Sequence, residues 1–294
     1  MKHILNIFIF LTISQFVRSQ NTILWKVTDT INNKSSFILG TVHQIGNSFV
    51  DSIPQIKEHL KNSDLALFES VDKVDYTRNI IEKRERSNEI EKRLKKKDLL
   101  KLKEIASNWK VDLYKLKPIE IRWKLQQEYQ ILVCKTVKLN DEFDHLDYYL
   151  QYLAEDNKVK LLGLEINQLD IIEKEYENPN WESERKNISV WIQKITNDSS
   201  TAKNCDYANR YMLFDIDYEF TKECESNYII LQRNNEWMKT IPNLLRINNV
   251  FIAVGIEHLK WKCGILKQLE NQGFKIEPIE LKPVANNDNR CTGQ

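Results

Sequence analysis

Several catalytic motifs are missing from this sequence. It contains no H-E-x-x-H segment, no G-x-S-x-G segment and no glycine-rich phosphate loop. Five cysteines are present, but no two of them have the C-x-x-C spacing of a cysteine zinc site or a thioredoxin-like centre. The sequence therefore gives no support for a zincin, a serine hydrolase, a nucleotide-binding enzyme or a dithiol oxidoreductase.

A charge imbalance is also missing. The 43 basic and 42 acidic residues leave a formal net charge of +1, and the seven tryptophans are spread along the chain. No basic surface for nucleic acid or for an anionic membrane is therefore indicated. The apolar fraction of 41% and the charged fraction of 29% are typical of a folded globular protein.

A long apolar run is missing except at the N-terminus. Lys2 and His3 precede an apolar stretch at residues 4–13, and Val17 and Ser19 supply small residues at the −3 and −1 positions of a cleavage site. This order predicts a signal peptide over residues 1–19, and hence a secreted or periplasmic protein. The run is too short for a permanent membrane span, and the alternative is an uncleaved anchor.

The remaining chain is expected to form a single domain over residues 20–284, followed by a polar tail at residues 285–294. An exported protein can form disulfides, but the odd number of cysteines leaves at least one unpaired or paired between chains. Cys205 and Cys224 flank a helical segment and are one plausible pair, although spacing does not determine connectivity. The five cysteines are Cys134, Cys205, Cys224, Cys263 and Cys291.

Four apolar segments of strand length lead directly to a histidine or a glutamate. Residues 37–43 (FILGTVH) and 250–258 (VFIAVGIEH) both continue into Gly-x-x-His, whereas residues 64–69 (DLALFE) and 158–165 (KVKLLGLE) end in a carboxylate. The strand at residues 37–43, a helix at 53–60 and the strand at 64–69 follow one another in the chain. This strand–helix–strand order predicts a parallel sheet. Ligands of such sheets bind beyond the carboxyl ends of the strands, so these side chains are expected to share one site.

The residues at these strand ends have the chemistry of a metal-dependent enzyme. Imidazoles and carboxylates, here His43, His258, Glu69 and Glu165, bind zinc, manganese or iron, and a spare carboxylate can act as a general base. Arg233, on an amphipathic segment, could hold a substrate carboxylate or a developing oxyanion. The structural alternatives are turn residues for the histidines, helix-capping or salt-bridging roles for the glutamates, and a buried ion pair for Arg233.

Helices are expected between and after these strands, and His145 is interpreted as a cap in an acidic helix start. The expected helices cover residues 53–60, 76–103, 99–109, 119–134, 146–157, a start at 168–176, 182–197, 205–214, 217–224, 225–245, bent or ended near Pro242, and 264–271. Further strands are expected at residues 22–27 and 274–281.

Five segments in order resemble the TraB/GumN family: LGTVH, SDLALFES, LLGLEINQ, RNNEW, and AVGIEHL followed by GILKQLENQGFKI. The resemblance extends over residues 24–281. The family includes the TIKI proteins, which are metal-dependent proteases acting on Wnt. The resemblance implies an α/β (mixed α+β) fold, with a central, mostly parallel sheet in two pseudo-repeated halves flanked by helices, similar to erythromycin esterase and the haem-binding ChaN group.

The resemblance also implies roles for individual residues. His43, His258 and Glu69 occupy the expected metal or catalytic positions, and Glu165 and Arg233 fall in the other recurring motifs. The bulky residues 260–263 depart from the small or glycine-rich sequence of many relatives, and are expected to narrow the mouth of the pocket.

The expected function is a secreted or periplasmic metal-dependent hydrolase, a TIKI-like peptidase. A divalent ion (Mn, Co or Zn) would be bound by His43, His258 and Glu69, with Glu69, Glu165 and Arg233 in catalysis and a peptide or protein as the substrate. One alternative is a non-catalytic protein that binds haem, a metal or a small ligand in the same pocket, and another is an interaction protein without chemistry. Neither a nucleic-acid partner nor a permanent membrane span is expected, and the sequence leaves the oligomeric state open.

Overall fold

The computed structural model describes residues 21–71, 74–164, 180–196, 204–224 and 228–283. The predicted signal peptide, the polar tail and the helix start at residues 168–176 lie outside these ranges, as does Cys291. Within the described part of the chain, none of the helices combines the length and the apolar character that crossing a bilayer requires.

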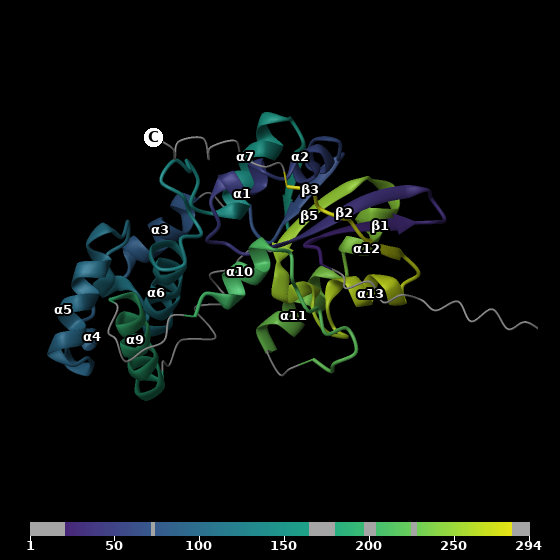
Figure 1. The fold of residues 1–294 in the computed structure, drawn as a ribbon. Coiled ribbons are helices and arrows are strands. Elements are labelled where there is room, and N and C mark those ends of the chain that lie inside the picture. The colour runs from purple at the N-terminus through teal and green to yellow at the C-terminus, as the bar shows by residue number, and fades with distance from the viewer. Residues whose placement is uncertain (1–20, 72–73, 165–179, 197–203, 225–227, 284–294) are drawn as a thin grey trace, which may run out of the picture.

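The centre of the fold is a six-stranded sheet with the order β4-β3-β5-β2-β1-β6 (Figure 1). The strands are β1 (Leu24–Asp29), β2 (Lys34–Thr41), β3 (Leu65–Phe68), β4 (Lys160–Gly163), β5 (Val250–Gly255) and β6 (Lys275–Pro278). The four strands from β4 to β2 are mutually parallel, and β1 and β6 add two antiparallel pairings. The predicted mixed α/β fold with a mostly parallel sheet is therefore confirmed.

The position of each strand follows from its sequence. β5 (VFIAVG) and β3 (LALF) are continuous apolar runs, and such runs suit central parallel strands that are covered on both faces. β1 (LWKVTD) alternates between buried and less buried residues, as in a strand with one core face. The outer strands β4 and β6 carry lysines, and β6 also ends in a proline, features that limit further pairing at sheet edges.

Helices cover both faces of the sheet. Figure 1 shows α1, α2 and α7 on one side, and α11, α12 and α13 on the other. The helices around the sheet are α1 (Asn47–Asp51), α2 (Pro54–Lys61), α7 (Leu146–Asp156), α10 (Asp206–Met212), α11 (Tyr228–Trp237), α12 (Ile241–Ile247), η3 (Ile256–Leu259) and α13 (Ile265–Asn271). Their apolar residues form one large hydrophobic cluster with the strands.

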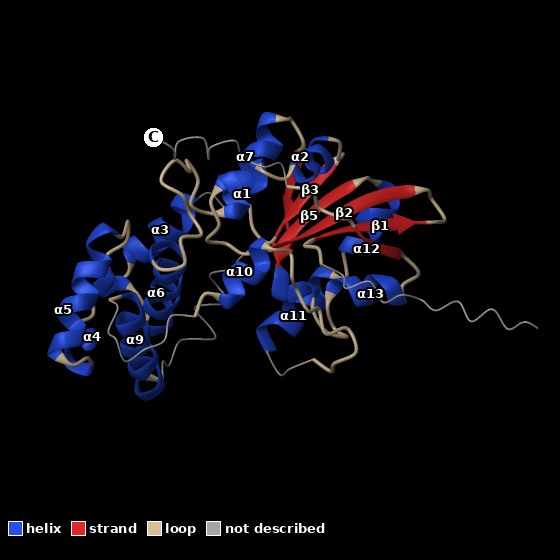
Figure 2. Cartoon of the chain, in the orientation of Figure 1, coloured by secondary structure: helices blue, strands red, loops and turns tan. Residues whose placement is uncertain are grey.

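A second group of helices lies beside the sheet and has its own hydrophobic cluster (Figure 2). This helical part consists of α3 (Val74–Lys83), α4 (Glu89–Arg93), α5 (Lys96–Ile105), η1 (Ala106–Asn108), η2 (Leu113–Lys115), α6 (Pro118–Leu132) and α9 (Trp181–Ile195). Leu102, Leu125 and Ile192 are completely buried in its cluster. Arg84 pairs with both oxygens of Glu120 at 2.7 and 3.0 Å and so joins the segment after α3 to α6.

Two expectations about helices are wrong. Residues 217–224 are irregular, and Glu219 among them has a positive φ angle of 47°, which interrupts a right-handed helix. The described part of the segment predicted at 225–245 is not one helix that bends or ends near Pro242, since α11 ends at Trp237 and α12 begins at Ile241. Pro242 lies in the first turn of α12, where its missing N–H costs no hydrogen bond, so it starts a helix instead of bending one.

The suggested pairing of Cys205 with Cys224 is also wrong. Cys134 is bonded to Cys205, and Cys224 is bonded to Cys263. Each bond joins segments that are distant in sequence, with separations of 71 and 39 residues. The segment between Cys205 and Cys224 is therefore held at both ends, once to the end of α6 and once to the loop after η3.

Candidate functional site

The parallel strands place the two Gly-x-x-His segments side by side. Thr41 at the end of β2 pairs with Gly255 at the end of β5, and Phe68 at the end of β3 pairs with Ala253. The residues that follow, His43, Glu69 and His258, therefore leave the sheet at one edge, as expected from the sequence. They belong to two hydrogen-bonded clusters, one around His43 and one around His258.

Asp147, in the first turn of α7, holds His43. Its Oδ2 lies 2.5 Å from His43 Nδ1, and its Oδ1 accepts a 2.8 Å hydrogen bond from Thr41 Oγ1. The backbone continues the contact, because Leu146 N donates to His43 O at 2.8 Å. The Asp147 side chain is 11% exposed and the His43 side chain 47%, so a buried carboxylate orients an imidazole that is open to ligands.

His145 completes this first cluster. Its ring stacks on His43 with centroids 5.0 Å apart and on Tyr148 with centroids 4.1 Å apart. His145 occupies the N-cap position of α7, but its side chain makes no capping hydrogen bond, so the capping interpretation is wrong. Its Nδ1 is buried, lies 3.7 Å from Asp147 Oδ2 and has no hydrogen-bond partner among the described residues.

The second cluster contains Glu69, Arg233 and His258. Arg233 donates from Nη2 to Glu69 Oε2 at 2.5 Å and from Nη1 to His258 Nε2 at 3.1 Å. The other Glu69 oxygen accepts a 2.6 Å hydrogen bond from Gly255 N and lies 3.8 Å from His258 Nε2. A Cβ atom on Gly255 would lie 3.1 Å from this oxygen, so glycine leaves room for the carboxylate to approach the strand.

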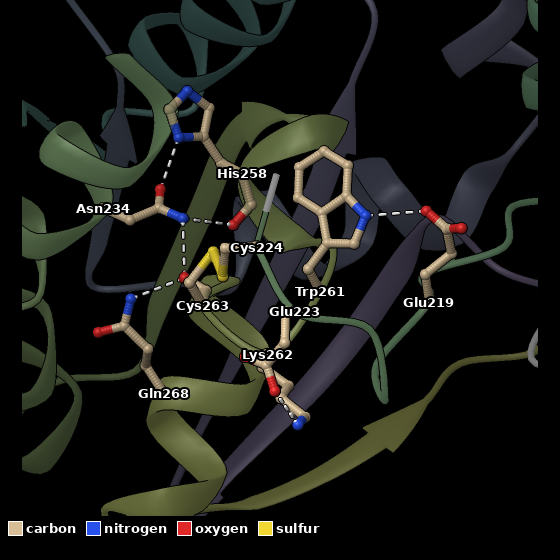
Figure 3. The surroundings of a disulfide bond; sticks show 9 residues. All are labelled: Glu219, Glu223, Cys224, Asn234, His258, Trp261, Lys262, Cys263 and Gln268. Atoms are coloured by element: carbon tan, nitrogen blue, oxygen red, sulfur yellow. Dashed lines mark hydrogen bonds and ion pairs between the residues drawn. A yellow bond between two sulfur atoms is a disulfide. The ribbon is translucent and has the colours of Figure 1, made fainter. Parts of the chain in front are cut away.

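Asn234 fixes the His258 ring (Figure 3). Its Oδ1 lies 2.6 Å from His258 Nδ1, and its Nδ2 donates to the carbonyl oxygens of His258 and Cys263 at 3.1 Å each. An amide oxygen can only accept here, so His258 carries its proton on Nδ1 and presents Nε2 as an acceptor to Arg233. Cys263 is itself bonded to Cys224, and the disulfide therefore lies next to the group that orients the imidazole.

The two clusters stabilise opposite charge states of their histidines. At His43, desolvation lowers the pKa, but the Asp147 carboxylate outweighs this and raises the pKa to about 9. At His258, burial comes first and lowers the pKa to about 4, with Arg233 acting in the same direction against Glu69. At neutral pH His43 is therefore a cation paired with Asp147, and His258 is neutral.

The charges of the two clusters also act on each other. Burial raises the pKa of Glu69, but Arg233, His258 and His43 outweigh it, and the net pKa is lowered. Burial similarly raises the pKa of Asp147, and His43 brings it down to about 2. Both carboxylates are therefore ionised at neutral pH, and each is paired with a cation, Asp147 with His43 and Glu69 with Arg233.

The structure locates four of the five site residues predicted from the sequence. His43, Glu69, Arg233 and His258 lie at the same edge of the sheet, whereas Glu165 lies outside the described residues. Strand β4, which precedes Glu165, ends at Gly163 beside Phe68, the residue before Glu69.

Sequence reasoning missed Asp147, His145 and Asn234 as site residues. Asp147 was considered only as an acidic residue at a helix start, although its spacing of two from His145 places both in the first turn. Asn234 stands next to Arg233 in the RNNEW segment, but an asparagine inside a helix gives no sign of its tertiary partner.

The first cluster has the composition of a divalent-metal site. His43, His145 and Asp147 each offer a ligand atom, and these atoms lie within 4.8 Å of one another. Two imidazoles and a carboxylate are a common donor set for zinc, manganese and iron. The unpartnered His145 Nδ1 is the observation that fits a metal best, because a buried ring nitrogen without a partner is otherwise costly.

Comparison with known proteins gives one match. The model of the TraB/PrgY/gumN family matches residues 23–278, which includes every residue of both clusters. No curated protein and no solved structure matches significantly. The order of the motifs, the shared strand edge and this match agree, and the chain belongs to the TraB/PrgY/gumN family.

Proposed function

We propose that this protein is an exported, metal-dependent hydrolase that cleaves peptides. The observation that carries the proposal is the cluster of His43, His145 and Asp147, in which a buried imidazole nitrogen has no partner among the described residues. The N-terminal sequence supports export, and family membership is consistent with a peptidase of the TIKI type.

His43, His145 and Asp147 would hold the divalent ion. A metal ion bound there would supply a water molecule whose pKa is lowered toward neutrality. The ligand set predicted from the sequence, His43, Glu69 and His258, lies at the same edge of the sheet. For His258 to bind a metal through Nε2, the Arg233 guanidinium would have to leave its position 3.1 Å from that atom. His43 is common to both sets of ligands.

The second cluster would act on the substrate. Arg233 is 13% exposed in its side chain and is oriented by Glu69, so its guanidinium is fixed where it can stabilise an oxyanion. Neutral His258, held by Asn234, accepts a hydrogen bond from Arg233 at Nε2 and so helps to keep the guanidinium in this position. Glu69 is ionised and holds Arg233 in place.

One observation favours a second function, the binding of a metal or small ligand without turnover. Each oxygen of Glu69 already accepts a hydrogen bond, from Arg233 Nη2 or from Gly255 N, and the pKa of this carboxyl is lowered, so Glu69 is held in place as a weak base. Glu69 acting as a general base would therefore require a rearrangement.

Cleavage of a peptide library distinguishes the two functions. The disulfide-bonded chain starting near Asn21 would be treated with chelator, loaded with Mn²⁺, Co²⁺ or Zn²⁺, and incubated with the library for analysis by mass spectrometry. We expect cleavage with at least one metal and none after chelation. In Arg233→Lys the rate of cleavage should fall at least 100-fold, because lysine keeps the charge but not the two donor groups of the guanidinium. Metal binding without any cleavage would instead support the binding function.

A further inference from the structure

A cavity of about 460 Å³ separates the helical part from the sheet edge. One wall comes from α6 and the segment after η1, and includes Trp109, Trp123 and Ile131. The opposite wall comes from the start of α7, with His145 and Tyr148. A cavity between two packed units is a common position for a ligand, and this volume is within the usual range for ligand pockets.

The cavity begins at the first cluster. His145 lines it and stacks on His43 on one side and on Tyr148 on the other. A molecule in the cavity would therefore lie one imidazole ring away from His43. No separate channel is needed to join the cavity to the proposed metal ligands.

The aromatic wall is held rigidly. Trp109 donates from Nε1 to Glu128 Oε1 at 2.9 Å, and Lys124 Nζ lies 5.6 Å from the centre of the same ring. Burial comes first among the causes that lower the pKa of Lys124, so its ammonium is poorly solvated. An indole whose N–H and face both have partners presents its remaining apolar surface in a fixed orientation.

The charges around the cavity nearly cancel. The lining contains three cations and three carboxylates, namely Arg78, Lys110 and Lys124 with Glu120, Glu128 and Asp144. Arg84, outside the lining, pairs with Glu120 and leaves an excess of one positive charge, and Glu128 accepts from Trp109. A nearly balanced rim and aromatic walls favour an apolar group over a charged one, because a charge would lose its hydration for little net attraction.

The lining also offers hydrogen bonds to a peptide backbone. Gln44, Asn108 and Gln127 each contribute a side-chain amide to the wall. Such amides both donate and accept, as a peptide group requires.

We propose that this cavity is the subsite that binds a large apolar side chain, aromatic or aliphatic, of a peptide substrate at a position next to the bond placed at His43. The assignment rests on the proposed function and names its substrate class. Trp109, Trp123 and Ile131 determine the preference for the side chain.

Binding is measured without cleavage, so that this assignment is tested apart from hydrolysis. Fluorescently labelled peptides that differ at one position would be titrated by anisotropy into the chelated, disulfide-bonded protein. We expect Phe, Trp or Leu at one fixed position to bind at least tenfold more tightly than Ala or Asp. Trp123→Ala should abolish this preference, and Ile131→Asp should shift it toward Lys or Arg, a change of specificity that a loss of folding cannot produce.

The outcomes separate the two proposals. Equal affinity for all peptides in the wild-type protein, or an unchanged apolar preference in a folded Ile131→Asp variant, would overturn the subsite. A wild-type preference for apolar side chains that becomes a preference for Lys or Arg in Ile131→Asp establishes the subsite. If no metal then produces cleavage, only the hydrolase proposal is contradicted. Cleavage without any preference at this position would leave the hydrolase and remove the subsite.

Discussion

Asp147 is the residue on which the first cluster depends. It accepts hydrogen bonds from Thr41 and lies 2.5 Å from His43 Nδ1, so it fixes the orientation of the imidazole and raises its pKa. A carboxylate that only orients a metal-binding histidine typically contributes a factor of about 10–100 to metal affinity, so Asp147, which is also a proposed ligand, should contribute at least a factor of about 10.

We therefore expect Asp147→Asn to weaken Mn²⁺ or Zn²⁺ binding at least tenfold, as measured by isothermal titration calorimetry. Asp156→Asn is the matched control, because Asp156 lies exposed on the same helix. Equal affinities of the two variants would show that Asp147 has only a structural role.

The buried neutral state of His258 makes stability depend on pH. Its pKa is about 4 in the folded protein against an ordinary value of 6.5, so below pH 6.5 the unfolded chain binds a proton that the folded chain does not. The contribution of neutral His258 to the free energy of unfolding is fully present above pH 6.5 and is lost as the pH falls toward 4.

We expect the free energy of unfolding to fall between pH 6.5 and 4, by roughly 1–3 kcal/mol more in the wild-type protein than in His258→Asn. Urea titrations at several pH values measure this difference. His43 acts with the opposite sign, since its raised pKa gives a contribution that is lost only as the pH rises from 6.5 toward 9. Parallel pH profiles for the two proteins would contradict the neutral state of His258.

Among the secondary-structure elements, the two disulfides stabilise different parts of the fold. Cys224–Cys263 lies beside Asn234, which orients His258, whereas Cys134–Cys205 joins the end of α6 to the start of α10. Removing either bond releases a long loop in the unfolded chain and should cost roughly 2–4 kcal/mol of stability.

We expect only the Cys224→Ser/Cys263→Ser variant to change the NMR signals of the His258 imidazole. The Cys134→Ser/Cys205→Ser variant is the control, with a comparable loss of stability in urea and unchanged His258 signals. Identical His258 spectra in both variants would show that the Cys224–Cys263 bond does not support the site.

The central strands could be predicted from the sequence, but the loop at residues 217–224 could not. β3 and β5 were predictable because a short apolar run bounded by turn residues is typical of a buried strand, and Glu69 and His258, which come after these strands, followed from that prediction. The irregular path of residues 217–224 was not predictable. It depends on distant contacts, among them the hydrogen bond from Tyr218 OH to Thr22 O at 2.8 Å.

For the molecule as a whole, the two hydrophobic clusters are the main feature that the sequence did not show. A single domain over residues 20–284 was predicted, because the highly charged stretch at residues 82–103, where the helical part begins, is equally typical of exposed helices within one domain. The cavity between them arises from the relative position of α6 and α7, which no local pattern specifies.

We expect Leu125→Ala, in the core of the helical part, to cost about 2–5 kcal/mol. The loss of hydrogen-exchange protection should be concentrated in α5, α6 and α9, and should spare β2, β3 and β5. Leu245→Ala, equally buried in the sheet cluster, is the control with the reverse pattern. Uniform loss of protection in both variants would show that the two clusters open together.

His43 and its neighbours are proposed to bind one divalent metal ion at the carboxyl edge of the sheet. The decisive measurement is elemental mass spectrometry of the chain starting near Asn21, purified without chelator, for the wild-type protein and for His43→Ala, His145→Ala and His258→Ala. We expect nearly one metal ion per wild-type chain and its loss in folded His43→Ala and His145→Ala. Retention in His258→Ala favours the ligand set with Asp147, and loss favours the set with Glu69. The same trace of metal in all four proteins, even after addition of Mn²⁺, Co²⁺ or Zn²⁺, would contradict the metal site.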